Sequence, residues 1–319
     1  MKLVRALTAI ASPGGRQGRL LTFFFHRVLE QPDPMMPGEP DARRFDRTLR
    51  WIGEQFRVLP PLEACGQLSV GRLPARAAII SFDDGYRDNH DVALPILKRH
   101  GMQAAFFIAT GYLGDGVQFN DRLVEAFREL RAAAFHAQGL GLGTLPTATT
   151  EAKLLALERV REAIKYLEPA ARSEAVERVE KACGAAAPGR RPRIMMTPEE
   201  VKALAANGME IGGHTVTHPI LRSVDDATAA AEIRSGREAL ASVLGRPPSL
   251  FAYPNGKLGT DFEQRHAEMA REAGFDYAFS TERGVASAAT DPMMLPRFMP
   301  WDAERWRFEL QALRVVIGR

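Results

Sequence analysis

The chain has 319 residues, of which 45% are hydrophobic and 25% are charged, and these values are near globular averages and exclude disorder of the whole chain. With 42 basic against 39 acidic residues, the net charge is too small to indicate nucleic-acid binding. No apolar run reaches the ~18 residues of a membrane-spanning helix. The two cysteines lie far apart in the chain and provide neither a disulfide framework nor a cysteine-based zinc site.

Residues 1–19 are predicted to form an N-terminal extension before the first strand. Arg5 interrupts the apolar stretch 3–10, and a turn rich in glycine follows at once. We therefore expect no secretion signal and a cytoplasmic protein.

From residue 20 onward the chain alternates short apolar runs with helical patterns, which indicates βα units and a mainly parallel sheet. Apolar runs of strand length occur at 20–25, 77–82, 104–109, 209–212, 250–253, 277–280 and 293–295. Helical patterns cover 45–56, 91–97, 226–244, 261–273 and 301–316. Thr197, Pro198 and Glu200 form the signature of a further helix start.

Residues 115–195 differ from this alternation, because they are rich in Ala, Glu, Arg and Leu and carry two or three helical patterns. Without them, the rest of the chain has about the 200–250 residues of one α/β barrel. We therefore predict a single barrel domain over 20–319 with a helical insertion at 115–195. Insertions after barrel strands lie on the side of the active site, so we expect this one to flank the substrate.

Polar residues follow nearly every apolar run. They are His26, Asp83-Asp84, Thr110, His214, Tyr253-Pro254-Asn255, Thr281-Glu282 and Arg297. The carboxyl ends of the strands of a parallel barrel meet at one face, where active sites form. The sequence therefore predicts one site built from residues that are far apart in the chain.

Two of these clusters have the composition of a metal site. Asp83 and Asp84 follow a strand, where successive side chains point to opposite faces, so one carboxylate can bind a metal while the other stays free as a base. The alternative is a solvated Asp-Asp-Gly turn. His214 and His218 share one face if their segment forms a helical turn. Imidazole and carboxylate groups bind zinc and similar metals, so we predict a divalent-metal site.

The segments SFDDG at 81–85, GHTVTHP at 213–219 and FAYPNG at 251–256 resemble the first three motifs of the NodB-type polysaccharide deacetylases, carbohydrate esterase family four. The order of the motifs and their placement at strand ends also match, and the resemblance covers residues 20–114 and 196–300. It implies an α/β fold, a distorted TIM-like (β/α) barrel. It also implies a hydrolase that removes N-acetyl or O-acetyl groups from a polysaccharide or its lipid-linked precursor.

The resemblance implies a role for each motif residue. The metal ligands would be Asp84, His214 and His218. The first candidate for the metal would be Zn²⁺, and Co²⁺, Mn²⁺ or Ni²⁺ would be the alternatives. Asp83 would be the general base, and the backbone N–H of Tyr253 would hold the oxyanion. The substrate-binding residues would be Tyr253, Pro254 and Asn255.

Two positions depart from the family pattern. The segment 247–251 lacks the arginine that pairs with the base in better-known members, and residues 295–297 read Leu-Pro-Arg where those members carry a histidine acid. We expect Arg297 to pair with Asp83 and hold it ionised, the alternative being an arginine that binds an anionic sugar or a surface carboxylate. We expect His26 to face the pocket as the acid, the alternative being a structural histidine bonded to the backbone.

Two other functions stay open at this point. One is a glycan-binding pseudoenzyme whose altered motifs mark lost catalysis, and the other is a hydrolase of small amides or formyl groups. The intact base and ligand residues argue against a binder, because a binder has little need of a base beside a metal. Trp301 follows the last strand, and we expect it to pack between helix and barrel rather than stack on a sugar.

Overall fold

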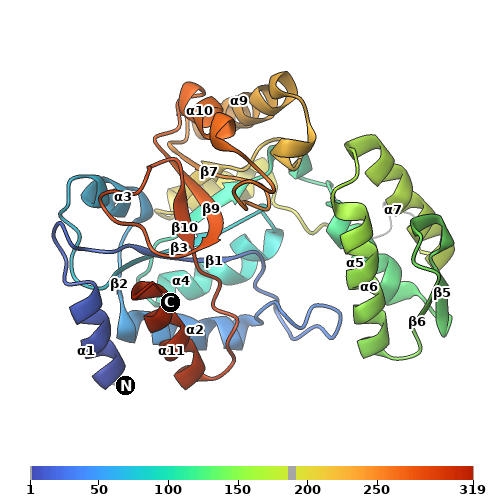
Figure 1. The fold of residues 1–319 in the computed structure, drawn as a ribbon, viewed down its shortest axis with the longest axis horizontal. Helices are drawn as coiled ribbons and strands as arrows, with labels where there is room; N and C mark the ends of the chain where they lie inside the picture. Colours follow the sequence, from blue (N-terminus) through green and yellow to red (C-terminus); the bar gives the residue numbers. More distant parts are fainter. Residues whose placement is uncertain (1, 186–191, 319) are drawn as a thin grey trace. The chain divides into compact units, whose positions relative to one another are not determined.

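The structure, a computed structural model, describes residues 2–185 and 192–318 (Figure 1). It consists of two compact units. The barrel unit comprises residues 1–31, 38–114 and 195–319, and the insert unit comprises residues 32–37 and 115–194. Part of the predicted insertion, residues 186–191, lies outside the described residues, as do residues 1 and 319.

The barrel unit is built on a parallel sheet whose strand order is β1-β3-β4-β7-β8-β9-β10, with β2 pairing to the start of β3. The strands are β1 (Leu21–Phe25), β2 (Arg57–Val58), β3 (Ala77–Phe82), β4 (Ala105–Ile108), β7 (Glu210–Gly213), β8 (Leu250–Ala252), β9 (Tyr277–Arg283) and β10 (Leu295–Arg297). Each neighbouring pair along this order for which a register exists is parallel.

The sheet curls until its two ends meet. Phe23 of β1 forms a parallel bridge with Phe298, the residue after β10. The Phe24 N–H donates to the Phe298 carbonyl at 3.1 Å, and the Phe298 N–H donates to the Thr22 carbonyl at 2.8 Å. The result is a nearly closed barrel of seven parallel strands, which confirms the predicted distorted TIM-like (β/α) fold.

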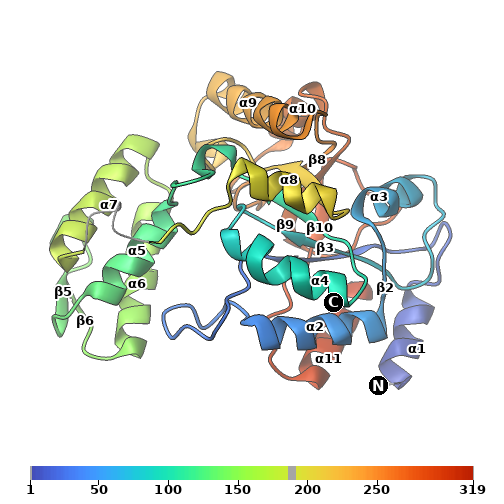
Figure 2. The same cartoon turned by 180° about the vertical axis from the view of Figure 1, so that it is seen from behind.

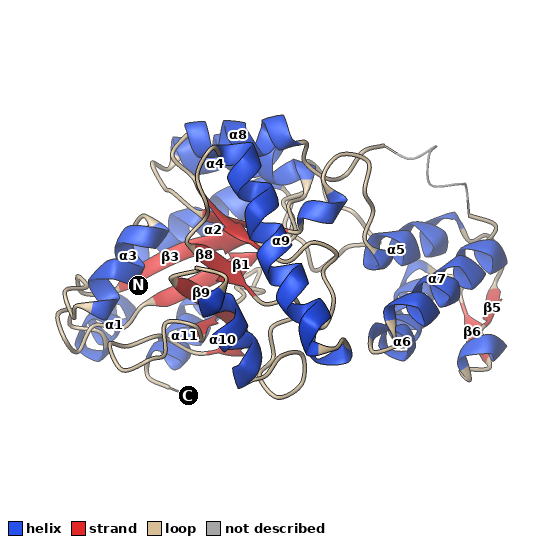
Figure 3. Cartoon of the chain, turned by 90° about the horizontal axis from the view of Figure 1, so that it is seen from above, coloured by secondary structure: helices blue, strands red, loops and turns tan. Residues whose placement is uncertain are grey.

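Helices cover the outside of this barrel (Figures 2 and 3). They are α1 (Lys2–Ala11), α2 (Ala42–Gln55), α3 (Pro61–Ser69), α4 (Leu94–Arg99), α8 (Pro198–Ala206), α9 (Asp226–Leu244), α10 (Gln264–Glu272) and α11 (Arg305–Val316). Helix α8 begins at the predicted signature: the Thr197 hydroxyl accepts from the Glu200 N–H at 3.3 Å, and the Glu200 carboxylate accepts from the Thr197 N–H at 2.8 Å. This reciprocal cap satisfies two N–H groups that a bare helix end leaves open.

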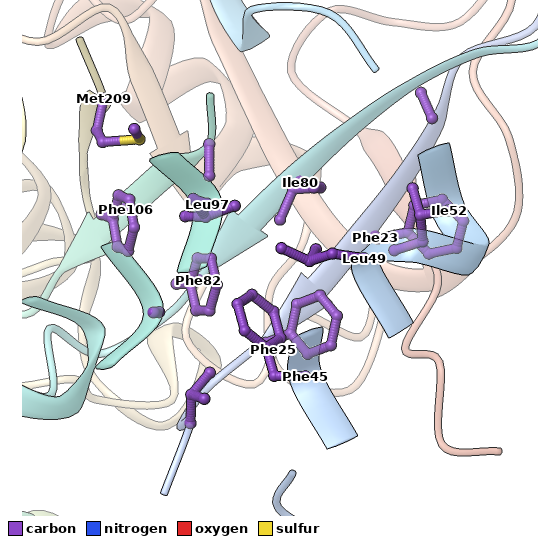
Figure 4. Packing of buried hydrophobic residues seen from close by; sticks show 14 of the residues in the cluster. Phe23, Phe25, Phe45, Leu49, Ile52, Ile80, Phe82, Leu97, Phe106 and Met209 are labelled. Atoms are coloured by element: carbon purple, nitrogen blue, oxygen red, sulfur yellow. The ribbon is translucent and has the colours of Figure 1, made fainter. Parts of the chain in front are cut away.

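Alternation along β3 sorts its side chains between two cores. Ile80 and Phe82 point outward into a cluster with α2 and α4, where the Phe82 and Phe106 rings stack 4.7 Å apart (Figure 4). Ile79 joins the cluster that includes β8, β9 and β10 residues in the barrel interior. Because the side-chain period of a strand is two, the odd-numbered positions of β3 lead inward and reach Asp83 just beyond its end.

The insert unit has its own apolar core. It consists of α5 (Phe119–Glu129), α6 (Thr150–Lys165), α7 (Pro169–Cys183) and an antiparallel hairpin of β5 (Ala134–His136) and β6 (Thr144–Pro146). Met35 is buried in this core, and the Asp33 carboxylate pairs with Arg128 at 2.7 Å. These two contacts explain why the short segment 32–37 belongs with the insert unit although the sequence pattern placed it in the barrel.

Two expectations about the C-terminal part are wrong. The last strand occupies 295–297 instead of 293–295. The Met294 N–H donates to the Asp291 carbonyl, so the first two apolar residues of the predicted run belong to a turn. Trp301 is 56% exposed, so it is not packed between helix and barrel.

The stacked rings of Phe82 and Phe106 provide a test of the packing of the core. Replacing Phe106 by alanine is expected to lower the free energy of unfolding by about 3–5 kcal/mol, because the ring is fully buried and leaves a cavity. Val70→Ala, at a site 62% exposed, should change it by less than about 0.5 kcal/mol. Urea denaturation of both variants makes the comparison, and equal effects would contradict this account of the core.

Candidate active site

A buried ion pair joins the end of β3 to β10. The Arg297 guanidinium donates from Nη1 to Oδ1 of Asp83 at 2.7 Å and from Nη2 to Oδ2 at 2.8 Å. Its Nε donates to the Ser280 carbonyl at 2.8 Å, and its guanidinium lies 4.5 Å from the ring centroid of Phe24. Asp83 is 2% exposed and Arg297 is fully buried. The fork of Arg297 therefore holds Asp83 in one orientation.

The pair decides the charge of Asp83. Burial by itself would raise the pKa of this carboxyl, but the positive charge and hydrogen bonds of Arg297 outweigh burial and lower the pKa to about 2. Asp83 is thus a buried carboxylate that stays ionised at neutral pH.

A second cluster stands beside this pair. Oδ1 of Asp84 lies 3.6 Å from Nε2 of His214 and 3.3 Å from Nε2 of His218, and the two imidazole rings meet edge to face at 4.8 Å. The ligand-type atoms of these three residues all lie within 4.8 Å of one another. One carboxylate and two imidazole nitrogens therefore converge on a common point.

The chemistry of this cluster fits a divalent metal. Oδ1 of Asp84 is buried and has no hydrogen-bond partner among the described residues, which leaves a buried acceptor without compensation unless a cation supplies it. Nδ1 of His214 bonds to the Ala252 carbonyl at 2.7 Å, so its Nε2 carries a lone pair toward Asp84. Burial lowers the pKa of His218 to about 4, although Asp84 opposes that shift, so this imidazole is also neutral and able to bind a metal.

Helix α9 holds the loop that carries the two histidines. One carboxylate oxygen of Glu232 accepts from the N–H groups of Val216 and Thr217, each at 2.8 Å, and the other accepts from the Thr217 hydroxyl at 2.8 Å. Gly236 lets this helix approach closely, since a Cβ there would lie 2.9 Å from the Thr215 backbone. Glu232 is a functional residue that the sequence patterns did not indicate.

The site also concentrates unusual backbone conformations. Among the described residues, five non-glycine positions have positive φ, and four of them belong to the predicted motifs: Asp84 (77°), Thr215 (64°), His218 (53°) and Asn255 (60°). Such left-handed conformations are sterically costly and persist where surrounding contacts enforce them. Both ligand segments are therefore held in place by tertiary contacts and not by a helical turn, which corrects the expectation for His214 and His218.

His26 lies at the end of β1, and its charge acts on both Asp83 and Asp84, lowering their pKa values. Its ring meets the Phe24 ring edge to face at 5.8 Å. Its carbonyl accepts from the Asn89 side chain at 2.9 Å. The backbone of His26 is thus anchored, while its partly exposed ring belongs to the same electrostatic environment as the two aspartates.

Tyr253 does not take the position expected for it. Its hydroxyl donates to the Met293 carbonyl at 2.9 Å, its ring stacks on Phe262 at 3.9 Å, and it is fully buried. Its N–H donates to the Phe279 carbonyl at 3.1 Å within the sheet, so it is already engaged and cannot serve as a free oxyanion donor. Pro254 has no N–H, and Asn255 follows it in a left-handed conformation.

A further group of metal-ligand side chains occurs in the barrel unit, formed by His90, Asp91 and Glu200. Its carboxylates have other partners, because Asp91 pairs with Arg87 at 2.8 Å and Glu200 caps α8. The cluster around Asp84 is therefore the better candidate for a metal site.

A family model for polysaccharide deacetylases matches residues 71–278, more than half of the chain and all three quoted motifs. The chain belongs to the polysaccharide deacetylase family. The Bacillus subtilis protein YxkH, which is named as a member of this family, is 19% identical over 247 residues, 77% of this chain and 60% of that relative. The chain thus spans about 60% of the length of that relative.

Two solved structures show the same fold. The deacetylase PplD of Streptococcus pyogenes superposes with a TM-score of 0.58 at 18% identity, covering 88% of this chain and 92% of that one. IcaB from Ammonifex degensii gives 0.57 at 18% identity, covering 96% and 98%. At this level of identity the likeness establishes the barrel fold. Among the described residues of this family member, no helix is long and apolar enough to cross a membrane.

Glu232 provides a test of how the ligand loop is held. Glu232→Ala is expected to weaken Zn²⁺ binding by about 10–100-fold, the range for residues that orient metal ligands. Competition with a chromophoric chelator measures the affinity. Glu238→Ala, an exposed position on the same helix, is the matched control. Equal affinities for the two variants would contradict the role assigned to Glu232.

The Asp83–Arg297 pair predicts a pH dependence of stability. Because the pKa of Asp83 is lowered from 3.8 to about 2, its contribution is complete above pH 4 and is lost as the pH falls through about 2. Asp83→Asn should flatten the dependence of unfolding free energy on pH in this window, whereas the exposed control Asp276→Asn should keep the wild-type slope. Urea denaturation across the acidic range measures both, and an unchanged slope in Asp83→Asn would refute the assignment.

Proposed function

We propose that this chain is a metal-dependent hydrolase that removes acetyl groups from a polysaccharide or its lipid-linked precursor. The observation that carries the proposal is the buried Asp83–Arg297 pair directly beside the Asp84, His214 and His218 cluster. Adjacent carboxylates with separate partners suit a base and a metal ligand, and both lie at the carboxyl end of β3, where barrel sites form.

Asp84, His214 and His218 would hold the metal, with Zn²⁺ as the first candidate because it binds imidazole and carboxylate together. A divalent ion bound there would supply polarisation of the acetyl carbonyl and acidification of water. The proton transfers and the stabilisation of the oxyanion are carried out by side chains and backbone groups of this chain.

Asp83 accepts the proton of the attacking water. Arg297 keeps Asp83 ionised, and each carboxylate oxygen retains a second lone pair beyond the one that Arg297 occupies. The low pKa makes Asp83 a weak base, so the nucleophile must itself be acidic enough to release its proton easily.

Two further residues complete the proposed mechanism. His26 donates a proton to the leaving amine or alcohol, which its position at the end of β1 and its electrostatic interaction with both aspartates support. The backbone N–H of Asn255 stabilises the oxyanion in place of the engaged N–H of Tyr253, because Pro254 between them has none. The buried side chains of Tyr253 and Pro254 pack behind the turn that carries Asn255.

The proposed partner is an acetylated glycan. A cytoplasmic step in surface-glycan assembly would bring this substrate to the chain, and neither nucleic acid nor a membrane span enters the proposal. N-acetyl and O-acetyl groups suit the same chemistry, and the leaving-group role of His26 matters more for an amide, since an amine leaves poorly without a proton.

Asp83→Asn tests the assignment of the base. The variant should retain Zn²⁺ affinity yet release acetate from N-acetylglucosamine oligomers about 10²–10⁴-fold more slowly, because the amide cannot take a proton. Chelation should abolish acetate release by the wild type, and added Zn²⁺ or Co²⁺ should restore it.

The control is Asp276→Asn, an exposed aspartate outside the site, which should behave as wild type. Full turnover by Asp83→Asn would show that another group is the base. Absence of acetate release by the wild type on both N- and O-acetylated glycans would reject the proposed function.

A further inference from the structure

Helix α1 presents its larger apolar side chains to solvent. Leu3 and Ile10 are 71% and 76% exposed, and Leu7 is 41% exposed. Because these positions follow one another at spacings of four and three residues, their side chains lie on one side of the helix. Single exposed apolar residues are ordinary on a protein surface, whereas a contiguous apolar stripe marks a place of interaction.

The packed side of α1 is poorer in apolar surface than the exposed side. It consists of Val4, Thr8 and Ala11, again at spacings of four and three residues. Thr8 is buried and its hydroxyl donates to the Val4 carbonyl at 2.9 Å, while Ala11 packs against the core of the barrel unit. A surface helix normally turns its apolar stripe toward the core, so α1 is oriented in the reverse sense and keeps its stripe available for a partner.

Helix α11, which contacts α1, has a similar exposed stripe (Figures 1 and 2). Trp306, Leu310 and Ile317 are all exposed, and their spacing of four and seven residues places them on one side of α11 and its C-terminal cap. Tryptophan is the side chain most typical of the boundary between water and lipid, because its ring is apolar and its N–H is polar. Two adjacent helices therefore expose apolar side chains that the core does not use.

Positive charge is concentrated on the same two helices. Residues 1–20 contain four basic residues and no acidic one, whereas the net charge of the whole chain is only +3. Arg314 on α11 is exposed. The acidic residues of this helix and its N-terminus, Glu304 and Glu309, each pair with an arginine of α11, at 3.1 and 2.7 Å. The surface around the apolar stripes is thus positive, although the rest of the chain has no net positive charge.

These positive charges also act on one another. Burial and the charge of Arg5 on α1 lower the pKa of Arg76, which precedes β3. Among the described residues, neither Arg5 nor Arg314 forms an ion pair. Positive groups that interact without an acid between them repel each other in the free protein, and an anionic surface relieves this repulsion.

We propose that α1 and α11 form a docking surface for a lipid bilayer that contains anionic headgroups. The apolar stripes enter the boundary between headgroups and acyl chains, and the arginines contact lipid phosphates. Exposed leucine, isoleucine and tryptophan beside surplus arginine is the composition of helices that lie in this boundary. With 10 residues, α1 is about 15 Å long, half of the ~30 Å hydrocarbon core, so it lies along the membrane surface. Such docking is independent of the proposed acetate release.

Cosedimentation of the full chain with lipid vesicles tests this surface. The wild type should bind vesicles of equal parts phosphatidylcholine and phosphatidylglycerol, and should bind less to phosphatidylcholine alone or at high salt. Leu3→Glu and Ile10→Glu should each lower the partition coefficient at least about tenfold, because a glutamate removes an apolar contact and adds repulsion from the headgroups.

Leu155→Glu is the matched control. Leu155 lies on α6 in the insert unit and is 71% exposed, as Leu3 is, so this variant introduces the same charge on a surface that is not expected to meet lipid. It should bind the mixed vesicles as the wild type does. Circular dichroism should give the same spectrum for all these variants, because the substituted side chains are exposed.

Tryptophan emission reports on α11 separately. Emission should shift to shorter wavelength when the wild type binds the mixed vesicles, since the Trp306 ring enters an apolar environment. Trp306→Phe should still cosediment but should lose most of this shift. A shift that is unchanged in Trp306→Phe would overturn the part assigned to α11.

Three results would overturn the docking surface as a whole. They are no binding of the wild type to the mixed vesicles, an equal loss of binding in Ile10→Glu and Leu155→Glu, and a lipid-free dimer that Ile10→Glu dissociates. The last result would show that a second copy of this chain covers the stripe. Vesicle binding is measured without a glycan, so its failure and a failure to release acetate are separate observations.

Discussion

The bidentate contact between Arg297 and Asp83 is the interaction on which the rest of the site depends. An ionised carboxylate in a fully buried position is unstable without a partner, and breaking such a pair leaves an uncompensated charge. Here the partner comes from β10, and the Ser280 carbonyl and the Phe24 ring position its guanidinium. Closure of the barrel therefore places the counter-charge that keeps Asp83 ionised in its buried position, which ties the chemistry of the site directly to the fold.

The metal cluster is maintained in a different way, by backbone geometry. Asp84 and His218 adopt left-handed conformations, and Glu232 binds the N–H groups of the loop between the histidines. The glycine at 236 lets α9 approach that loop. Strain in the ligand segments is thus offset by hydrogen bonds and close packing around them, so that the three ligand atoms converge on one point.

The sequence predicted much of this arrangement because the apolar runs have strand length and each ends in a polar cluster. It could not reveal Glu232, which lies inside a regular helix and gains its role only through tertiary contact. Helix α3 was not predicted, because it has no side-chain cap and contains Gly66. The position of Tyr253 was predicted wrongly because a residue at a strand end can turn inward or outward. The exposure of Trp301 was predicted wrongly because this side chain lies against Gly38, which is distant in the sequence.

The position of Arg297 also has a consequence for the order in which the protein is made. All three candidate ligands are present once residue 218 has been synthesised, whereas the counter-charge of Asp83 arrives about 80 residues later, with the strand that closes the barrel. A nascent chain therefore contains the metal ligands before the arginine that pairs with Asp83, and Glu232 and the Ala252 carbonyl, which hold those ligands, are added in between. The complete site forms only when the final seam closes, so closure of the barrel and formation of the Asp83–Arg297 pair are one event.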